Sequence, residues 1–459
     1  MKRRDFVKVT SLGLGAGLTI LTNGINAAET KANNKINVAL IGCGGRGKDL
    51  LMGFNYPGAR IPGFREFDDV NVLYACDVRK ERGEKIAGDA ETKYVPDMRT
   101  VLDDPKVDAV ICALPDHWHA LAAIRACQAG KDVYTEKPAS HSGWEGEQMV
   151  KAARKYKRIV QHGTQNRSAP YNIAAKKYIE DGKLGKIHLC RVFNQKYEMN
   201  SFKIKSEPLP QGFSENNWSE WLGPASERPF SSTILNRNWH ELWDFSSGDV
   251  LNDGVHQIDL ARWLAGVKFP ESAYAAGGRF TDPPEKSDGQ TPDTLIATYK
   301  FDDLIFTVEE TLYTRYMLKI DAEVRMSDMV PYWMQCATAI ELYGTKGLMK
   351  VARHGGGWQV FDRPKDRKPV IKETGHGRFP DEPHKRNFLE SIKTRNLPNA
   401  DIAEGHCSTA LVHYSTVSYR LGGAALKINK ETGKIEDNAD AAKYWKRDYR
   451  APYIIPDEV

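Results

Sequence analysis

A glycine-rich hexapeptide is the first part of this sequence that could do chemistry. Residues 42–47 are Gly-Cys-Gly-Gly-Arg-Gly, and they stand between an apolar run and a segment with helical spacing. Glycine at these positions permits a tight turn, lets backbone N–H groups approach a pyrophosphate and allows close packing of helix on strand. The alternative is a structural turn in a sheet that binds no nucleotide. The candidate dinucleotide-binding residues of this loop are Gly42, Gly44, Gly45, Arg46 and Gly47.

An acidic residue follows the second apolar run. Asp77 comes directly after residues 70–76, where a carboxylate can accept hydrogen bonds from the adenosine ribose. Its separation from the glycines is longer than usual, and the insertion at residues 55–69 accounts for the difference. A carboxylate repels a 2′-phosphate, so the sequence favours NAD, while Arg79 and Arg46 keep NADP open because a guanidinium can pair with that phosphate. Asp77 could also be a helix cap.

A lysine follows a later apolar run. Residues 136–138 are Glu-Lys-Pro, directly after the run 133–135. Ligands of open parallel sheets bind outside the carboxyl ends of the strands, so Glu136 and Lys137 should face the dinucleotide. An ammonium group there can donate to a substrate hydroxyl and stabilise the alkoxide that develops as hydride leaves carbon. The alternative is an ordinary surface lysine at a strand end.

A histidine in the second half of the chain could complete this chemistry. Residues 251–259 are Leu-Asn-Asp-Gly-Val-His-Gln-Ile-Asp. His256 could take the proton from the hydroxyl being oxidised, because an unperturbed imidazole titrates near neutrality. Asp259 could orient the ring if this segment is helical. His256 could equally be an ordinary hydrogen-bonded histidine.

The first part of the chain predicts the scaffold that must position these residues. Five apolar runs predict strands at 36–41, 70–76, 107–114, 133–135 and 159–161. Helical patterns lie between them at 48–54, 80–90, 119–129 and 143–156. Continuous apolar strands that alternate with helices indicate a parallel sheet covered on both faces. We therefore predict an α/β fold that begins with a Rossmann dinucleotide-binding domain over residues 36–163.

The pattern changes beyond residue 163. A helix at 171–179 and a long strand at 186–196 precede a set of strands with few helices between them, at 295–301, 304–312, 339–342, 348–351 and 358–361. Two more helices are predicted at 384–393 and 404–421. These features favour an α+β domain over residues 164–459, built on an open, mostly antiparallel sheet that binds substrate and forms the oligomer. The exposed face of such a sheet predicts a homo-oligomer, a dimer or a tetramer.

Composition sets the class of protein. The 459 residues are 41% hydrophobic and include 10 Trp, 19 Tyr and 16 Phe, which excludes a disordered chain. Four cations and one acid in the first ten residues contribute +3 to the net charge of +5, so the remaining +2 gives no reason to expect nucleic acid. The seven cysteines form no C-x-x-C pair and predict small core residues, with no disulfide frame and no metal site.

The N-terminus has the layout of an export signal. A basic start with Arg3 and Arg4, a short apolar stretch and small residues at 26–28 predict a twin-arginine-type signal peptide over residues 1–28. Its apolar stretch is too short to span a bilayer, so we expect a periplasmic protein with no membrane span after signal removal. The alternatives are a short anchor or a basic cytoplasmic extension.

Taken together, these motifs resemble the Gfo/Idh/MocA family, named after glucose-fructose oxidoreductase, inositol dehydrogenase and a rhizopine-catabolism protein. The resemblance rests on the glycine loop, on Leu-Pro-Asp-His-Trp-His at 114–119, on Glu-Lys-Pro at 136–138 and on residues 254–259. Residues 221–225 and 448–453 also resemble an exported branch of the family, so the similarity covers about residues 36–453.

The resemblance implies NAD-dependent oxidation of a hydroxyl of a sugar, glycoside or cyclitol. Lys137 and His256 are implied as the catalytic pair, with His119 and Pro115 at the cofactor. Many relatives have aspartate where this chain has Asn252, and an amide can orient a hydroxyl but cannot accept its proton. The candidate substrate-binding residues are Trp118, Arg167, Trp239, Asp253 and His256, although Asp253 should point away from the site.

Two other functions remain open at this stage. One is a redox-neutral glycoside hydrolase or lyase that oxidises a sugar, cleaves the glycosidic bond of the keto-sugar and reduces the product again. Export favours a tightly bound NAD that is regenerated in place, because no soluble NAD pool is expected outside the cytoplasm. The other is a non-catalytic nucleotide-containing binding protein, in which Lys137 and His256 would have no purpose.

Overall fold

The structure is a computed structural model that describes residues 35–198 and 201–459. Residues 36–459 form one compact unit. The predicted signal segment, residues 1–28, lies outside the described residues. No helix in the described part of the chain is both long enough and apolar enough to cross a membrane.

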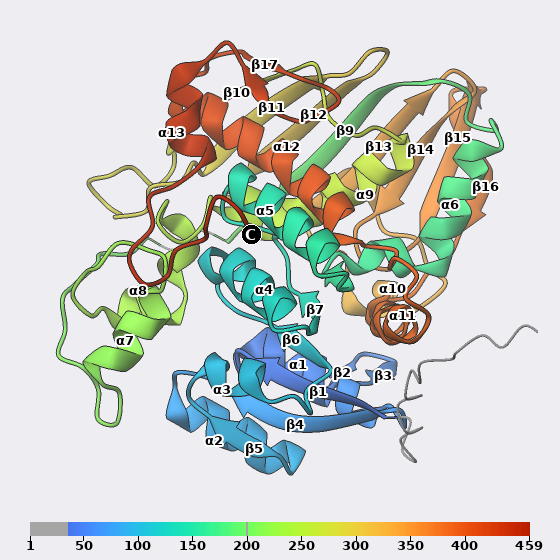
Figure 1. The fold of residues 1–459 in the computed structure, drawn as a ribbon. Helices are drawn as coiled ribbons and strands as arrows, with labels where there is room; N and C mark the ends of the chain where they lie inside the picture. The colour runs from blue at the N-terminus through green and yellow to red at the C-terminus, as the bar shows by residue number, and fades with distance from the viewer. Residues whose placement is uncertain (1–34, 199–200) are drawn as a thin grey trace, which may run out of the picture. The chain divides into compact units, whose positions relative to one another are not determined.

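The first layer is a parallel sheet, as predicted (Figure 1). Its six strands lie in the order β5 (Lys93–Val95), β4 (Val70–Cys76), β1 (Ile36–Ile41), β6 (Ala109–Cys112), β7 (Asp132–Thr135) and β8 (Val160–His162). The chain runs outward from β1 on one side through β4 and β5, and on the other side through β6, β7 and β8. A crevice opens at the carboxyl ends of the strands where the order reverses in this way.

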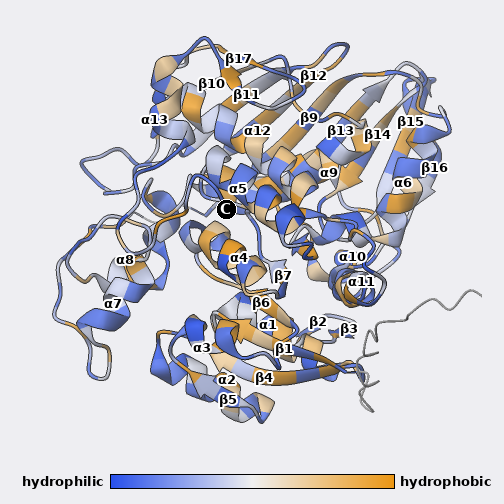
Figure 2. Cartoon of the chain, viewed as in Figure 1, coloured by the Kyte–Doolittle hydropathy of each residue, from blue (hydrophilic) through white to orange (hydrophobic). Residues whose placement is uncertain are grey.

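Helices cover both faces of this sheet. They are α1 (Gly45–Met52), α2 (Lys80–Ala90), α3 (Met98–Asp103), α4 (His119–Gln128) and α5 (Gly143–Lys155). Figure 2 shows hydrophobic residues concentrated along β1 and β4, whose apolar runs require burial on both sides. The insertion at residues 55–69 contains a hairpin, β2 (Phe54–Tyr56) and β3 (Ala59–Ile61), that the sequence pattern did not indicate.

The second layer is a large, mostly antiparallel sheet. Its ten strands lie in the order β16 (Lys368–Gly375), β15 (Trp358–Lys365), β14 (Gly347–Ala352), β13 (Thr338–Gly344), β9 (Ile187–Gln195), β12 (Ile305–Thr311), β11 (Thr294–Lys300), β10 (Ser272–Gly278), β17 (Leu426–Ile428) and β18 (Ile435–Glu436). Only the pair β9 and β12 is parallel among these described neighbours. This confirms the open α+β architecture expected after residue 163.

Three of the described helices pack on one face of the large sheet: α6 (Pro170–Glu180), α9 (Val255–Ala265) and α12 (Ile402–Arg420). The other described helices of the second half of the chain are α7 (Glu215–Leu222), α8 (Ser232–Asn236), α10 (Ala322–Arg325), α11 (Asp381–Thr394) and α13 (Ala442–Trp445). Helix α9 contacts β9 and β13, while α12 contacts β10 on one side and α5 on the other. Helix α12 therefore joins the two sheets into one unit.

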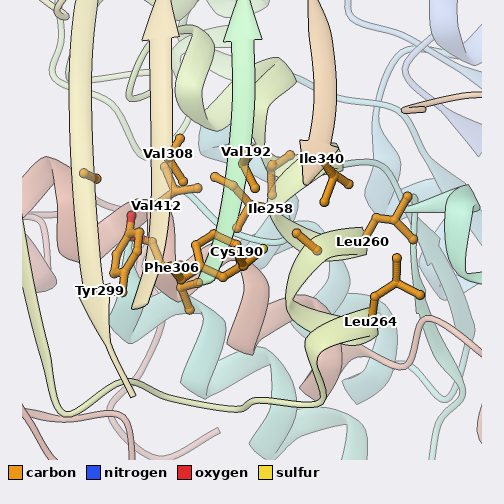
Figure 3. Close-up of a cluster of buried hydrophobic side chains, with 14 of the residues drawn as sticks. Cys190, Val192, Ile258, Leu260, Leu264, Tyr299, Phe306, Val308, Ile340 and Val412 are labelled. Atoms are coloured by element: carbon orange, nitrogen blue, oxygen red, sulfur yellow. The ribbon is translucent and has the colours of Figure 1, made fainter. Parts of the chain in front are cut away.

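Alternate residues of the strands build the core under α9. Figure 3 shows Val192, Val308 and Ile340 from three strands directed toward Ile258 of that helix. All four side chains are fully buried. Burying a side chain of this size stabilises the fold by about 1.5–3 kcal/mol, so the position of α9, which begins at the candidate catalytic segment, is set by the sheet.

A buried ion pair fixes α9 from its other side. Arg167 Nε donates to both carboxylate oxygens of Asp259, at 3.0 and 2.9 Å. Ser408 Oγ donates to Asp259 Oδ1 at 2.7 Å, and Arg167 Nη1 lies 3.1 Å from Glu404. Burial alone would raise the pKa of Asp259, but the Arg167 guanidinium holds it below its ordinary value. Arg167 was predicted to bind substrate and Asp259 to orient His256, whereas the structure uses both to hold the turn Gln165–Ser168, α9 and α12 together.

We expect Arg167→Ala to destabilise the protein strongly. Removing the guanidinium leaves the Asp259 carboxylate buried and unpaired, which costs roughly 3–5 kcal/mol. Urea unfolding followed by tryptophan fluorescence would measure the shift. Lys177→Ala is the control, because its ion pair with Asp181 is exposed and should leave the midpoint unchanged. An unchanged midpoint for Arg167→Ala would remove this pair from the stability of α9.

Candidate functional site

A cavity of about 280 Å³ lies at the carboxyl ends of the parallel strands, where the strand order reverses. Its walls include Gly42 and Gly44 after β1, Asp77 after β4, Pro115 after β6 and Lys137 after β7. We call it the cofactor cleft. The expectation that these segments meet at one edge of the sheet is confirmed.

The glycine loop leaves space where a pyrophosphate would bind. A Cβ at Gly42 would collide with the Ala113 carbonyl, and one at Gly47 with the Gly42 carbonyl, so these glycines permit the turn and the close packing. A Cβ at Gly45 would meet nothing within 4 Å. Among the described residues no side chain caps the N-terminus of α1. Its free N–H groups and positive end therefore face open space and fit an anionic diphosphate.

Asp77 ties the glycine loop to the end of β4. Its Oδ2 accepts from the Cys43 N–H at 2.7 Å and its Oδ1 from the Arg79 N–H at 2.8 Å. Burial raises the pKa of this carboxyl, and the two N–H donors counteract part of that rise. Asp77 lines the cleft, so it can both fix the loop and accept hydrogen bonds from a ribose.

Arg46 and Arg79, the two arginines that could pair with the 2′-phosphate of NADP, differ in how far other groups already bind them. Arg46 donates to Glu136 Oε1 and to Asp381 Oδ2, both at 2.7 Å, so two carboxylates already hold its guanidinium. Arg79 instead extends along the cleft, with Nε 2.9 Å from Glu81 and Nη1 3.2 Å from Asn236. Of the two, only Arg79 is placed to approach a 2′-phosphate.

Lys137 and Asn252 meet at the inner end of the cleft. Lys137 Nζ donates to the backbone carbonyl of Asn252 and lies 3.4 Å from its Oδ1. Asn252 belongs to a π-helical turn, Val250–Gly254, that leads directly into α9. A turn of this kind often marks a functional position within a helix.

Asn252 also lines a second cavity, which we call the polar cavity. Its walls are Glu198, Arg237, Asn238, His240, Glu241, Asp249, Asn252, Arg279, Asp282, Asp293 and Leu312. Asn252 is therefore a wall residue of both cavities, and Lys137 contacts it from the side of the cofactor cleft. A hydroxylated substrate in the polar cavity would lie beside the end of the dinucleotide.

His256 lies close to this contact but behind it. It is 4% exposed, lines neither cavity, and its ring centroid lies 4.6 Å from that of His354. Burial, and then electrostatic interaction with His354, Arg353 and Lys137, hold the pKa of His256 well below its ordinary value. His256 is therefore neutral at pH 7, and within the described part of the chain its Nδ1 has no hydrogen-bond partner.

Two predicted site residues are engaged elsewhere. Asp253 accepts from Lys196 at 2.5 Å and is also paired with Arg353. Its side chain lines neither cavity, as expected for the residue next to Asn252. His119 is fully buried, with Nδ1 2.6 Å from the Pro138 carbonyl and Nε2 2.8 Å from the Leu114 carbonyl. His119 thus holds two cleft loops in place without lining the cleft.

The two predicted tryptophans line the cofactor cleft and not the polar cavity. Trp118 is 4% exposed, and its indole N–H donates to the Trp221 carbonyl at 2.9 Å. Trp239 lies next to His240, with ring centroids 4.6 Å apart. Neither position favours the stacking on a sugar face that the sequence suggested.

Three acid–base residues at the site were missed. Asp116 lines the cofactor cleft and accepts from Ser246 Oγ at 2.5 Å, and burial raises the pKa of its carboxyl. His240 and Asp249 line the polar cavity, and burial lowers the pKa of His240 to about 4. Asp116 could have been found from its place in the loop after β6. His240 and Asp249 lie in an irregular stretch that gives no such signal.

A segment from the second half of the chain covers the cofactor cleft. Residues 215–241, the cover segment, contribute Glu220, Trp221, Leu235, Asn236 and Trp239 to its walls. Asn217 Nδ2 donates to the Val78 carbonyl at 3.1 Å. Arg450, close to the C-terminus, holds the segment from outside by donating to the Ser219 carbonyl at 2.6 Å. The cleft is therefore closed by long-range contacts and not only by the Rossmann fold.

Comparison with known proteins gives the same picture. The model of an oxidoreductase family with an NAD-binding Rossmann fold, Gfo/Idh/MocA, matches residues 36–164, and the model of its C-terminal alpha/beta domain matches residues 176–422. Levoglucosan dehydrogenase of Pseudarthrobacter phenanthrenivorans is 36% identical over 238 residues, and the alignment spans 50% of this chain and 51% of that enzyme. The scyllo-inositol 2-dehydrogenase (NAD(+)) of Bacillus subtilis is 29% identical over 63% of this chain and 71% of its own.

Solved structures share the fold. The WlbA dehydrogenase of Bordetella pertussis, in complex with NADH and UDP-GlcNAcA, superposes with a TM-score of 0.62 at 20% identity, over 86% of this chain and 98% of its own. The family matches, together with a glycine loop that fits a diphosphate, show that this chain belongs to the Gfo/Idh/MocA oxidoreductase family and carries its NAD-binding Rossmann fold.

Proposed function

We propose that this protein oxidises a hydroxyl group of a sugar, glycoside or cyclitol with NAD as hydride acceptor. The observation that carries the proposal is the contact of Lys137, which lines the cofactor cleft, with Asn252, which lines both that cleft and the polar cavity. The levoglucosan and inositol dehydrogenases among the relatives support the substrate class. When bound, NAD would accept the hydride that leaves the carbon of the substrate.

The side chains of the site divide the remaining work. Lys137 donates to the substrate oxygen and stabilises its negative charge as the alkoxide forms. Asn252 orients the hydroxyl, and its amide has no basic atom to receive the proton. His256 is the acceptor that the family resemblance implies, and its neutral form suits that role. His240, also neutral, lines the polar cavity and is the acceptor that the geometry adds.

We propose further that NAD stays bound between turnovers. Dissociation of NAD requires the cover segment to open. Side-chain contacts hold it to the Rossmann part at Asn217 with Val78, Asn236 with Arg79 and Glu220 with Arg99. The Trp221 carbonyl adds contacts with the side chains of His117 and Trp118. A slow dissociation of this kind suits a protein that is exported with its cofactor, which the predicted signal at residues 1–28 implies. A retained cofactor must be regenerated by a second substrate.

The closed cleft also supports a second function, a redox-neutral cycle. In that cycle a sugar hydroxyl is oxidised, the keto-sugar loses its glycosidic substituent, and the product is reduced by the same NADH. The two functions differ in net chemistry: the dehydrogenase accumulates a keto-sugar, while the redox-neutral enzyme releases an aglycone without net change in NAD. Incubation with aryl glycosides separates them.

We propose that the chain assembles as a homo-oligomer through the open face of the large sheet. Tyr274, Ile296 and Ile305 point away from the helices there and are 46%, 53% and 39% exposed. They lie on three adjacent strands, although none of them is directly opposite another in the strand register. Exposed apolar side chains gathered on one face can mark an interaction site. A second copy of the same face would cover it.

Lys137→Ala should lower the rate of hydride transfer by roughly 10²–10⁴-fold, the scale of losing a transition-state electrostatic partner or proton-transfer group. The rate is measured as nicotinamide absorbance in a single turnover with the best substrate from a sugar and cyclitol panel. Bound NAD per protein should not change, which a mass spectrum of released nucleotide checks. A rate within a few-fold of the unmodified protein would remove Lys137 from the mechanism.

Asp77→Ala should weaken NAD binding more than NADP binding. The variant loses a ribose acceptor and also the charge that repels a 2′-phosphate, so the two effects oppose each other only for NADP. Titration of protein fluorescence with NADH and NADPH measures both affinities. Because Asp77 also holds the Cys43 N–H, Asp77→Asn is the matched control that keeps an acceptor oxygen. Equal losses for the two nucleotides in Asp77→Ala would mean that Asp77 does not bind the ribose.

The double variant Asn217→Ala, Asn236→Ala should lose bound NAD during desalting, whereas the unmodified protein keeps about one equivalent. Removing both contacts speeds opening of the cover segment, and affinity changes of this kind act mainly through the dissociation rate. Asn396→Ala, on an exposed loop away from the cleft, is the control. Rapid exchange of NAD in the unmodified protein would contradict retention.

A further inference from the structure

The walls of the polar cavity carry more negative than positive groups. Five carboxylates line it, those of Glu198, Glu241, Asp249, Asp282 and Asp293, against two guanidiniums, those of Arg237 and Arg279. The formal charge of the lining is therefore −3. Resting on the proposed function, we infer that this cavity binds an uncharged polyhydroxylated ring and rejects sugars that carry a carboxylate or a phosphate.

Arg279 has no capacity left for an anionic ligand. It is 9% exposed in its side chain and is paired with both Glu241 and Asp282. Its Nη1 also donates to the Thr291 carbonyl at 2.7 Å. The guanidinium thus serves to hold two of the wall carboxylates in place. Of the two lining guanidiniums, only that of Arg237 is left to pair with an anion.

Lys196, a cation behind the cavity wall, is also paired with carboxylates. Lys196 is fully buried and does not line the cavity. Its ammonium group lies 3.1 Å from Glu198, 2.8 Å from Asp249 and 2.5 Å from Asp253. Asp253 also pairs with Arg353, and Glu198 with Lys319, and neither of these cations lines the cavity. The cations of this cluster therefore lie behind the cavity wall, and Glu198 and Asp249 are the charged groups that the cluster presents to the cavity.

Two carboxyl groups near the cavity have raised pKa values, and the charge of Asp249 contributes to both. Burial, followed by the charge of Asp249, raises the pKa of Glu310, which lies beside Asn194, well above its ordinary value. Burial also raises the pKa of Glu241, and Asp249 adds to the rise. A further negative charge brought in by a ligand would meet the same desolvation and the same repulsion.

The same walls suit sugar hydroxyls. An ionised carboxylate only accepts hydrogen bonds, and each hydroxyl supplies a donor. Asp249 is fixed for this purpose, since its Oδ2 accepts from Asn194 Nδ2 and from Lys196, both at 2.8 Å. Asn238 and Asn252 add amide groups that can both donate and accept. A neutral ring can therefore satisfy the wall at several positions, while a carboxylate in place of a hydroxyl satisfies none of the acceptors.

The test compares ligands that differ only in charge. The probes are methyl β-D-glucoside with methyl β-D-glucuronide, methyl β-D-galactoside with its galacturonide, and myo-inositol with a myo-inositol monophosphate. Binding to the protein loaded with NADH is measured by calorimetry, so that no turnover is needed. We expect the neutral member of at least one pair to bind, and to bind at least tenfold more tightly than its anionic partner.

Two variants test whether the wall charges cause the discrimination. Asp249→Asn and Glu241→Gln each remove one negative charge and should reduce the ratio between neutral and anionic ligands by several-fold. Glu309→Gln is the matched control, because Glu309 lies on β12, pairs with Arg191 and does not line the cavity. This control should keep the full ratio.

The inference is overturned if an anionic member binds as tightly as its neutral partner, or if no neutral member of the three pairs binds. Loss of an anionic ligand in Arg237→Gln would then assign the cavity to anions. Failure of the proposed function is a separate result: a neutral ligand would bind, but bound NAD would never be reduced by it. Oxidation of a uronate would have the opposite meaning, since the proposed function would stand and the inference would fall.

Discussion

The contact between Lys137 and Asn252 is the constraint on which the rest of the site depends. Lys137 belongs to the parallel sheet and Asn252 to the helix that packs on the large sheet, and their distance in sequence is 115 residues. An ammonium that donates to the Asn252 carbonyl can exist only if both layers hold their positions to a fraction of an ångström. The core under α9, the Arg167–Asp259 pair and the double contact of α12 supply that precision.

The cover segment and the glycine loop contribute differently to the cofactor cleft. The glycines and the N-terminus of α1 can attract a diphosphate, but a crevice at a sheet edge is open to water. Trp218 and Trp221 stack at 5.0 Å with their rings almost parallel, which gives the cover segment a small core of its own. The segment can therefore move or stay as a unit, and its few polar contacts with the Rossmann part set how long a nucleotide remains beneath it.

The sequence predicted the parts of the fold whose signal is local. The runs at β1 and β4 and the helix α2 have the expected bounds, because burial on both faces and helical spacing are properties of a few neighbouring residues. Lys137 could be placed at the cleft from one rule about strand ends. By contrast, β10, β16, β17 and β18 were missed, since their residues alternate weakly and are paired only through the large sheet.

The site residues that were missed share a cause. Asp116 acts with Ser246, which is 130 residues away, and Asp249 with Asn194, which is 55 residues away. No pattern in either segment announces such a partner. The same reasoning explains why Arg167 was misplaced: a lone arginine in a polar stretch gives no hint that a carboxylate 92 residues later will neutralise it.

The charged cluster behind the polar cavity shows why Asn252 can replace an aspartate without loss of order. Its neighbour Asp253 is locked by Lys196 and Arg353, and Asp249, one turn earlier, is locked by Lys196 and Asn194. Breaking one member of such a buried network leaves an unpaired charge, at a cost of about 3–5 kcal/mol. The backbone of the π-helical turn is therefore fixed from both sides of Asn252, and the side chain at that position is free to change from acid to amide while its carbonyl still holds Lys137. In the proposed mechanism, orientation of the ammonium is thus separated from acceptance of the proton, which we assign to another group of the site.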